Sequence, residues 1–171
     1  MAIADIKLLV FDVDGVLTDG RLYFGARGEE FKAFDARDGA GLKYLQRAGL
    51  ACAFLTGRAD RGAVKARARE LGVKHLVSGA KQKEPALAKL AGKLGLGLGA
   101  VGYVGDDLMD LPAMRIAGWS ACPADAVREV REAADYVAAA AGGRGAAREI
   151  IEQLLKEQGR WPAVLARYRP E

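Results

Sequence analysis

The sequence predicts an α/β fold, with a Rossmann-like, mainly parallel sheet and helices on both of its faces. Short apolar runs alternate along the chain with helical stretches of about ten residues, which is the pattern of repeated βαβ units. Right-handed crossovers between such strands place helices on both faces of the sheet. The chain has 171 residues, the size of one domain. We therefore expect a single domain over residues 1–171.

Six apolar runs are the predicted strands. The first, residues 6–11, is almost entirely apolar, as expected for a strand that is buried on both faces. It leads directly into the acidic turn Asp12-Val-Asp-Gly15. The remaining predicted strands are residues 50–55, 75–78, 100–104, 118–121 and 135–138.

Helical stretches occupy the intervals between these runs. Gly72 and Gly95 follow two of them at the position where a glycine commonly ends a helix. Pro85 stands in the first turn of one helix, where proline is tolerated. The predicted helices are residues 41–47, 60–71, 84–94, 108–116, 124–133 and 146–158.

Residues 17–34 depart from this alternation. Two short segments with aromatic residues flank a glycine-rich turn, Gly25-Ala-Arg-Gly28, which predicts an antiparallel hairpin that projects from the end of the first strand. At the other end of the chain, a tail of residues 159–171 matches no motif or element.

Composition limits the chemistry and the partners. The net charge of +4 favours anionic partners, and much of the excess lies near one predicted helix, at Arg58, Arg61, Lys65, Arg67 and Arg69. These residues form either a solvated helix face or a field that attracts an anionic substrate. No aromatic residues interleave with them, so we expect no nucleic-acid partner. A single histidine excludes a His-dyad mechanism and a His-rich zinc site.

The sequence also predicts where the protein acts. No apolar run approaches the roughly 20 residues that cross a bilayer. The first residues lack the basic patch and apolar stretch of a signal peptide. We expect a cytoplasmic protein that does not interact with membranes.

Acidic, hydroxyl and basic residues follow the predicted strands at or soon after their carboxyl ends, where open α/β sheets bind ligands. Each could be a helix cap or a surface residue when taken alone. Together, several carboxylates in one crevice would repel each other unless a cation neutralised them, and hard oxygen ligands favour Mg²⁺ over zinc. The residues are Asp12, Asp14, Thr56, Lys83, Asp106, Asp107 and Asp110.

The segment Asp12-Val-Asp-Gly-Val-Leu-Thr18 resembles the first motif of the haloacid dehalogenase superfamily of phosphatases. Thr56, Lys83 and Gly105-Asp-Asp-Leu-Met-Asp110 match its other three motifs in order and spacing. The resemblance covers about residues 6–140, and its first and fourth motifs are specific. It implies a phosphomonoesterase that acts through an aspartyl-phosphate intermediate.

The resemblance also implies a role for each motif residue. Asp12 attacks phosphorus, and Asp14 protonates the leaving oxygen and then activates water. Mg²⁺ is bound by the Asp12 carboxylate, the Asp14 carbonyl and Asp106, with Asp107 supporting it directly or through water. Thr56 donates a hydrogen bond to the phosphoryl oxygens, and Lys83 neutralises nucleophile and phosphate. Independently of the family, backbone N–H groups near Gly57 can bind the remaining oxygens.

Three further segments are similar to those of the capless, tetrameric branch of this superfamily: residues 34–39, 56–58 and 142–149. The intervals between the motifs have no room for a cap domain. This likeness implies a small phosphate ester as substrate, specifically a sugar acid phosphate such as 3-deoxy-D-manno-octulosonate 8-phosphate. Arg58 would bind the substrate at its carboxylate, and Arg144 would lie near the sugar. A flexible loop is the alternative for the glycine-rich segment around Arg144.

The hairpin predicts a homo-oligomer, because a two-stranded ribbon is marginal alone in water, and the resemblance implies that it is a tetramer. Its apolar residues, Leu22, Tyr23, Phe24, Phe31 and Phe34, would meet those of other copies. Arg144 or the tail, with Trp161 and Tyr168, would then cover a neighbouring site.

Other functions remain open at this stage. The substrate could be a nine-carbon keto-sugar acid phosphate, or several small metabolites; a nucleic-acid 3′-phosphatase is more distant. A non-enzymatic phospho-receiver domain also combines aspartates, Thr, Lys and magnesium. In receivers, however, the paired acidic residues follow the first strand, whereas here the Asp-Asp pair comes late.

Overall fold

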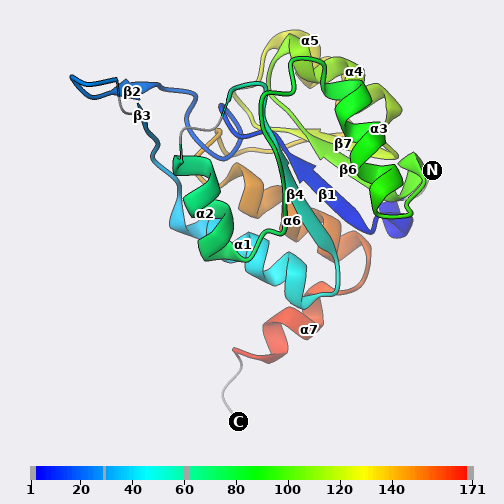
Figure 1. The fold of residues 1–171 in the computed structure, drawn as a ribbon. Coiled ribbons are helices and arrows are strands. Elements are labelled where there is room, and N and C mark those ends of the chain that lie inside the picture. Colours follow the sequence, from blue (N-terminus) through cyan, green and yellow to red (C-terminus); the bar gives the residue numbers. More distant parts are fainter. Residues whose placement is uncertain (1–2, 29, 60–61, 169–171) are drawn as a thin grey trace.

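A six-stranded parallel sheet forms the centre of the computed structural model, which describes residues 3–28, 30–59 and 62–168 (Figure 1). The strand order is β5-β4-β1-β6-β7-β8, so the chain builds outward from β1 on one side and then on the other. The strands are β1 (Leu8–Phe11), β4 (Ala51–Leu55), β5 (His75–Val77), β6 (Val101–Val104), β7 (Trp119–Cys122) and β8 (Tyr136–Val137). The prediction of a mainly parallel sheet is confirmed.

The side chains of β1 alternate between two cores. Leu8 and Val10 pack into one hydrophobic cluster, and Leu9 and Phe11 pack into the other. All four are completely buried. The near-continuous apolar sequence of this strand therefore reflects burial on both faces, as predicted.

Helices cover both faces of the sheet. On one face lie α1 (Ala36–Arg47), α2 (Ala63–Leu71) and α6 (Ala146–Glu157), and on the other lie α3 (Lys83–Lys93), α4 (Leu111–Ile116) and α5 (Arg128–Ala133). In Figure 1 the first three lie to the lower left of the sheet and the other three to its upper right. Among the described residues, no helix has the length and apolar character needed to span a membrane.

Several helix boundaries differ from the predictions. α1 begins at Ala36 rather than 41, because Asp35 caps it by accepting a hydrogen bond from the N–H of Arg37 at 2.6 Å. The predicted helix 108–116 is divided at Asp110 into a 3₁₀ turn, η3 (Leu108–Asp110), and α4. The predicted helix 60–71 is described from Ala63 onward; residues 60 and 61, including Arg61, lie outside the described residues.

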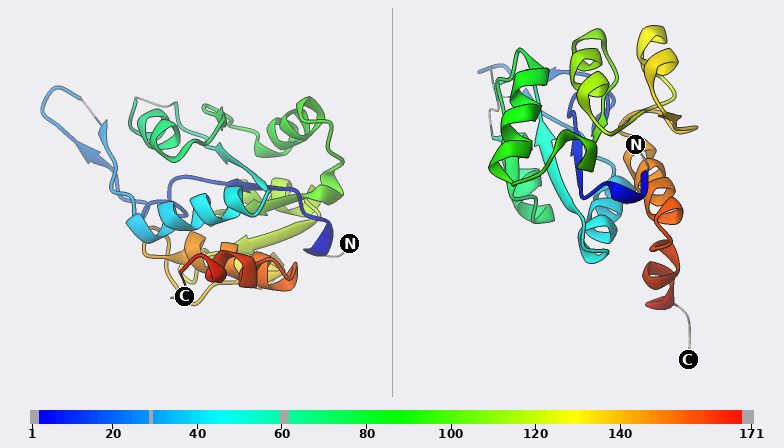
Figure 2. Two further views of the ribbon diagram at one scale, coloured as in Figure 1. Left: turned by 90° about the horizontal axis from the view of Figure 1, so that it is seen from below. Right: turned by 90° about the vertical axis from the view of Figure 1, so that its right-hand side faces the viewer.

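The predicted hairpin is present but short. Its strands are β2 (Tyr23–Phe24) and β3 (Glu30–Phe31), and they project from the body of the molecule (Figure 2). Residue 29, inside the predicted second strand, lies outside the described residues. The prediction that strand structure begins at Leu17 is wrong, because the N–H of Leu17 bonds to the carbonyl of Val13 at 3.0 Å in a tight turn.

The hairpin exposes large apolar side chains. Leu22, Tyr23, Phe24 and Phe31 are exposed, as expected. Phe34 does not belong to this set: it packs against the main core, with the guanidinium of Arg67 over its ring at 5.7 Å.

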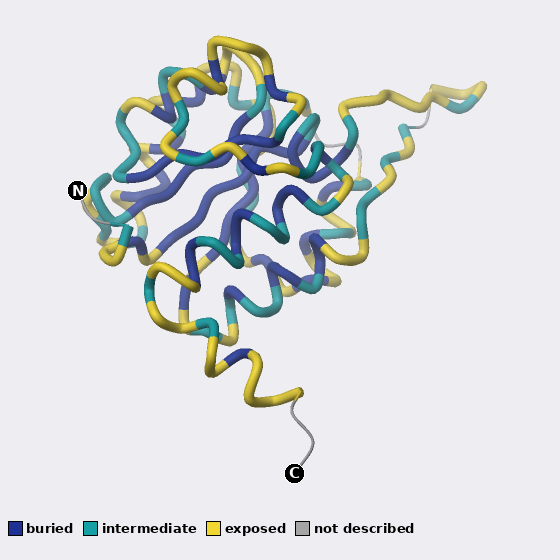
Figure 3. Tube along the Cα trace, turned by 180° about the vertical axis from the view of Figure 1, so that it is seen from behind, coloured by how far each residue is buried: buried dark blue, intermediate teal, exposed yellow. Residues whose placement is uncertain are grey.

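The tail contains a helix that the sequence did not predict, α7 (Trp161–Ala166). Trp161 packs edge-on against Tyr44 of α1, with ring centroids 6.1 Å apart, and Tyr168 lies 5.9 Å from the same ring. In this chain both tail aromatics therefore contact Tyr44 of α1. The tail itself lies at the far end of the molecule from the hairpin (Figure 3). Residues 169–171 of the tail lie outside the described residues.

Candidate active site

The candidate site lies at the carboxyl ends of the three central strands. Asp12 follows β1, Thr56 follows β4 and Asp106 follows β6 soon after its end. Since β1 lies between β4 and β6, their carboxyl ends are adjacent. The crevice also lies where the chain reverses its direction of winding, which is the usual ligand site of open α/β sheets.

A buried lysine lies at the centre of the site. Lys83 is the first residue of α3 and is only 2% exposed. Its Nζ atom lies 3.0 Å from Oδ1 of Asp12 and 2.6 Å from Oδ1 of Asp110. A lysine is this deeply buried almost only when carboxylates neutralise it. The geometry therefore supports the predicted placement of Lys83 beside Asp12.

Asp110 organises the other side of the crevice. Its Oδ1 atom accepts a hydrogen bond from the Tyr103 hydroxyl at 2.6 Å, in addition to that of Lys83. Its Oδ2 atom accepts from the N–H groups of Asp106 and Asp107, both at 3.2 Å. Asp110 thus fixes the lysine and the loop after β6, a positioning role that the sequence analysis did not assign.

Three carboxylates converge in the crevice. Asp12, Asp106 and Asp110 each offer an oxygen, and these oxygens lie within 4.8 Å of one another. Burial, together with the charge of Asp110, raises the pKa of Asp12 to about 7 even though Lys83 acts in the opposite direction. Burial and the charges of Asp12 and Asp110 raise the pKa of Asp106 to about 8. Lys83 alone therefore does not balance the charge of the three carboxylates.

One carboxylate oxygen in this cluster is buried without a hydrogen-bond partner among the described residues, Oδ1 of Asp106. Asp110 is fully engaged, so Asp12 and Asp106 are the carboxylates with free coordination capacity. An unpaired buried oxygen among repelling carboxylates fits a hard divalent cation such as Mg²⁺.

Asp107 is placed differently from Asp106. Its side chain is exposed and accepts a hydrogen bond from the N–H of Leu108 at 2.7 Å, which caps η3. It is not among the carboxylates whose oxygens converge. This position agrees better with support through water than with direct contact to a cation.

The hairpin contributes two site residues that the sequence analysis missed. Lys32 forms an ion pair with Asp14 and a second one with Glu30, at 2.8 Å. Arg58 donates to Glu30 at 3.0 Å, and its Nε atom lies 4.0 Å from Asp14. That Nε atom is buried without a hydrogen-bond partner in the described part of the chain. An alternating pattern could have revealed the pair, since Glu30 and Lys32 share one side of the ribbon.

Glycines allow the loops of the site to approach closely. Gly15 has a φ of +91°, and a Cβ there would lie 1.9 Å from Oδ2 of Asp106. A Cβ on Gly142 would lie 1.8 Å from the carbonyl oxygen of Gly15. The glycine-rich segment is therefore packed tightly on the loop after β1, which argues against the alternative of a flexible loop.

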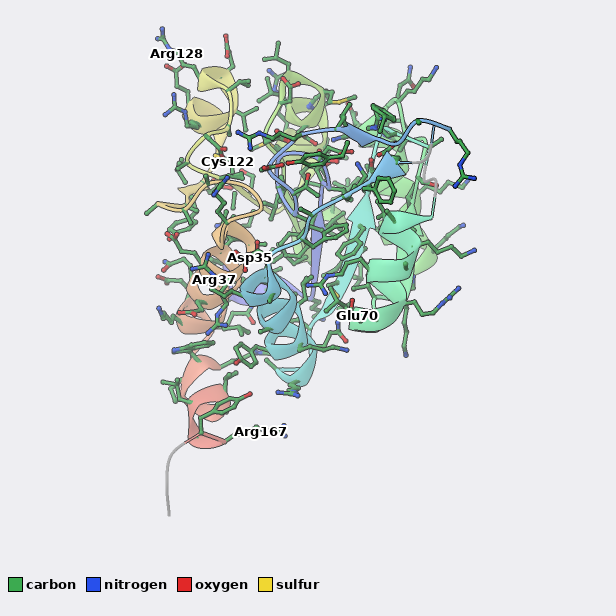
Figure 4. All side chains as sticks on the ribbon, turned by 90° about the vertical axis from the view of Figure 1, so that its left-hand side faces the viewer. Asp35, Arg37, Glu70, Cys122, Arg128 and Arg167 are labelled. Atoms are coloured by element: carbon green, nitrogen blue, oxygen red, sulfur yellow. The ribbon has the colours of Figure 1, made fainter. Side chains whose placement is uncertain are left out.

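Arg144 lies at the edge of this packed segment. Its side chain is exposed and forms no ion pair with the residues that the structure describes. Its carbonyl accepts a hydrogen bond at 3.0 Å from Arg37, which lies beside Asp35 in the first turn of α1 (Figure 4). Gly57 lies across the site, where a Cβ would meet the end of Met109 at 3.1 Å.

Comparisons with known proteins show which family the chain resembles. Residues 72–150 match the haloacid dehalogenase-like hydrolase family. The 3-deoxy-D-manno-octulosonate 8-phosphate phosphatase KdsC of Escherichia coli K12 is 45% identical over 156 residues, covering 91% of this chain and 82% of the relative.

Solved structures are similar over almost the whole chain. The phosphatase of the same name from Moraxella catarrhalis, in complex with magnesium, phosphate and KDO, has a TM-score of 0.94 at 40% identity, covering 98% of this chain and 95% of that one. The cobalt-bound enzyme from Haemophilus influenzae has a TM-score of 0.88 at 41% identity, covering 92% and 91% of the two chains.

The chain therefore belongs to the haloacid dehalogenase-like hydrolases and is a phosphoric monoester hydrolase. Within that family it belongs to the branch of the 3-deoxy-D-manno-octulosonate 8-phosphate phosphatases. Membership in a hydrolase family removes the phospho-receiver alternative.

Proposed function

We propose that the protein hydrolyses 3-deoxy-D-manno-octulosonate 8-phosphate with Mg²⁺, through an aspartyl-phosphate on Asp12. The observation that supports this most strongly is the buried arrangement in which Asp12 lies 3.0 Å from Lys83 and beside the unpaired oxygen of Asp106. The relatives bear this substrate in their names, which favours it over the nine-carbon alternative.

In this proposal the Asp12 carboxylate, the Asp106 carboxylate and the backbone carbonyl of Asp14 bind the metal ion, and Asp107 supports it through water. Mg²⁺ supplies positive charge that stabilises the phosphoryl oxygens as the ester bond breaks. Lys83 neutralises Asp12 and the incoming phosphate, because a carboxylate cannot approach a phosphate dianion unless positive charge screens both. Asp110 keeps Lys83 in place.

Asp14 transfers protons. A sugar alkoxide is a poor leaving group, so a positioned carboxylic acid accelerates its departure by about 10²–10⁴-fold. The same carboxylate then removes a proton from the water that attacks the aspartyl-phosphate. The hydroxyl of Thr56 and the backbone N–H of Gly57 donate hydrogen bonds to the phosphoryl oxygens.

Arg58 binds the carboxylate of the substrate. Its side chain is 41% exposed beside Asp14, so part of the guanidinium can reach a bound substrate. Arg144 lies nearer the sugar hydroxyls.

In this proposal, another copy of the chain completes the walls of the site. The cavity lined by Asp14, Glu30, Lys32, Thr56 and Arg58 has a volume of about 10 Å³, whereas ligand pockets usually measure about 300–1,000 Å³. A cytoplasmic homotetramer that packs the exposed hairpins together would enclose the substrate between subunits.

A panel of phosphorylated metabolites tests the proposal. We expect the highest kcat/KM for 3-deoxy-D-manno-octulosonate 8-phosphate. The kcat/KM for the nine-carbon acid phosphate should be at least about 10-fold lower, and the values for neutral sugar phosphates should be lower still. Asp12→Asn should abolish turnover of all of them. A neutral sugar phosphate hydrolysed as well as the acid would contradict the proposed substrate.

A further inference from the structure

The base of the hairpin has an inverted pattern of burial. The side chains of Glu30 and Lys32 are only 4% and 5% exposed, although both are charged. Phe31, between them, is 58% exposed. Charged side chains are rarely buried unless they are paired, so this burial requires a specific partner.

That partner is Asp14. Lys32 contacts Oδ1 of Asp14 and lies 2.8 Å from Oε1 of Glu30. The other oxygen of Glu30 lies 3.0 Å from Arg58, whose Nε atom lies 4.0 Å from Oδ2 of Asp14. The four side chains form a closed ring of alternating charge in which each carboxylate faces two cations.

We propose that Lys32 is a positioning residue for Asp14, and that Glu30 orients both Lys32 and Arg58. The orientation of the Asp14 carboxylate is then set by a segment 18 residues further along the chain. The base of the hairpin, whose exposed tip forms the proposed subunit contact, thereby prepares the group that transfers the proton. This inference rests on the acid–base role of Asp14 in the proposed function.

The leaving group of the substrate provides the test. A sugar alkoxide needs a proton from Asp14, whereas 4-nitrophenolate leaves readily without one. The measurement is the single-turnover rate of ester cleavage with the enzyme in excess, for a sugar phosphate and for 4-nitrophenyl phosphate. We expect Lys32→Gln to slow cleavage of the sugar phosphate by at least about 10-fold and that of the aryl phosphate by less than about 3-fold.

Three variants complete the experiment. Lys32→Arg should restore most of the sugar phosphate rate, because it keeps the ion pair. Glu30→Gln should also slow cleavage of the sugar phosphate more than that of the aryl phosphate, but by a smaller factor. It replaces Lys32→Gln in the test if that variant does not fold. Arg21→Gln removes one charge from an exposed position near the hairpin and should change neither rate.

Two outcomes would overturn the inference. If Lys32→Gln slows both substrates equally, Lys32 only anchors the hairpin; if it slows neither, Lys32 does not position Asp14. Asp14→Asn, measured in parallel, separates the two proposals. If Asp14→Asn itself shows no dependence on the leaving group, the acid role of Asp14 is wrong; if it does and Lys32→Gln does not, only the positioning by Lys32 is wrong.

Discussion

Replacing Asp12, the proposed nucleophile, should stabilise the metal-free protein against unfolding. Burial raises the pKa of Asp12 from 3.8 to about 7, so the fold favours its protonated form. The Asp12 carboxyl therefore contributes its full share to the free energy of unfolding below about pH 4, where it is protonated in both states. This contribution is lost as the pH rises through 7, where the buried carboxyl has to ionise. A difference of about three pH units corresponds to about 4 kcal/mol at pH 8. Asp12→Asn removes this cost because an amide does not ionise.

The assay is urea unfolding in excess chelator. We expect Asp12→Asn to raise the free energy of unfolding by about 4 kcal/mol at pH 8 and by only about 2 kcal/mol at pH 5. Saturating Mg²⁺ should narrow the difference, because it stabilises only the ionised carboxylate. Asp5→Asn, at an exposed aspartate, is the matched control and should change stability by less than about 0.5 kcal/mol. If Asp12→Asn did not raise the free energy of unfolding, or raised it equally at the two pH values, this reasoning would be refuted.

Three further predictions concern the metal, the substrate and the assembly. Activity should vanish on chelation and return when Mg²⁺ is added. Ca²⁺ should bind and inhibit, because its higher and looser coordination misplaces the proposed nucleophile. Full activity in chelator, with the metal content measured, would exclude a role for the metal in the reaction. Arg58→Ala should raise KM for the sugar acid phosphate by about 10-fold or more and barely change it for 4-nitrophenyl phosphate; equal effects would assign Arg58 to the phosphoryl group. Phe24→Ser combined with Phe31→Ser should lower the mass measured by light scattering, since both rings are more than half exposed; an unchanged mass would place the subunit contact elsewhere.

The sequence predicted the sheet well because local pattern and tertiary environment agree there. Residues 6–11 are apolar except for Lys7, and the strand that they contain is buried on both faces between β4 and β6. The same pattern located Asp12, Thr56 and Asp106, because the end of a parallel strand is visible in sequence as the change from apolar to polar residues.

Other parts depend on contacts that local sequence does not encode. Gly39 and Gly41 lower the helical propensity of the sequence at the start of α1. The helix nevertheless needs glycine there, because a side chain at either position would collide with α2 or α6. α7 is a short helix that packs against Tyr44, about 120 residues earlier in the chain. The sequence of the tail by itself therefore did not predict a helix. The positioning role of Asp110 depends on Lys83 and Tyr103, which reach its carboxylate from two other elements.

Trapping the covalent intermediate tests the central proposal most directly. Rapid acid quench of a reaction with substrate labelled in its phosphate, followed by proteolysis and mass analysis, should place the phosphoryl group on Asp12. The label should appear within one turnover, accumulate further in Asp14→Asn, where the attack of water is slowed, and be absent from Asp12→Asn. A protein that hydrolyses the ester while no label is ever found on Asp12, or that keeps its activity as Asp12→Asn, would contradict the proposed mechanism.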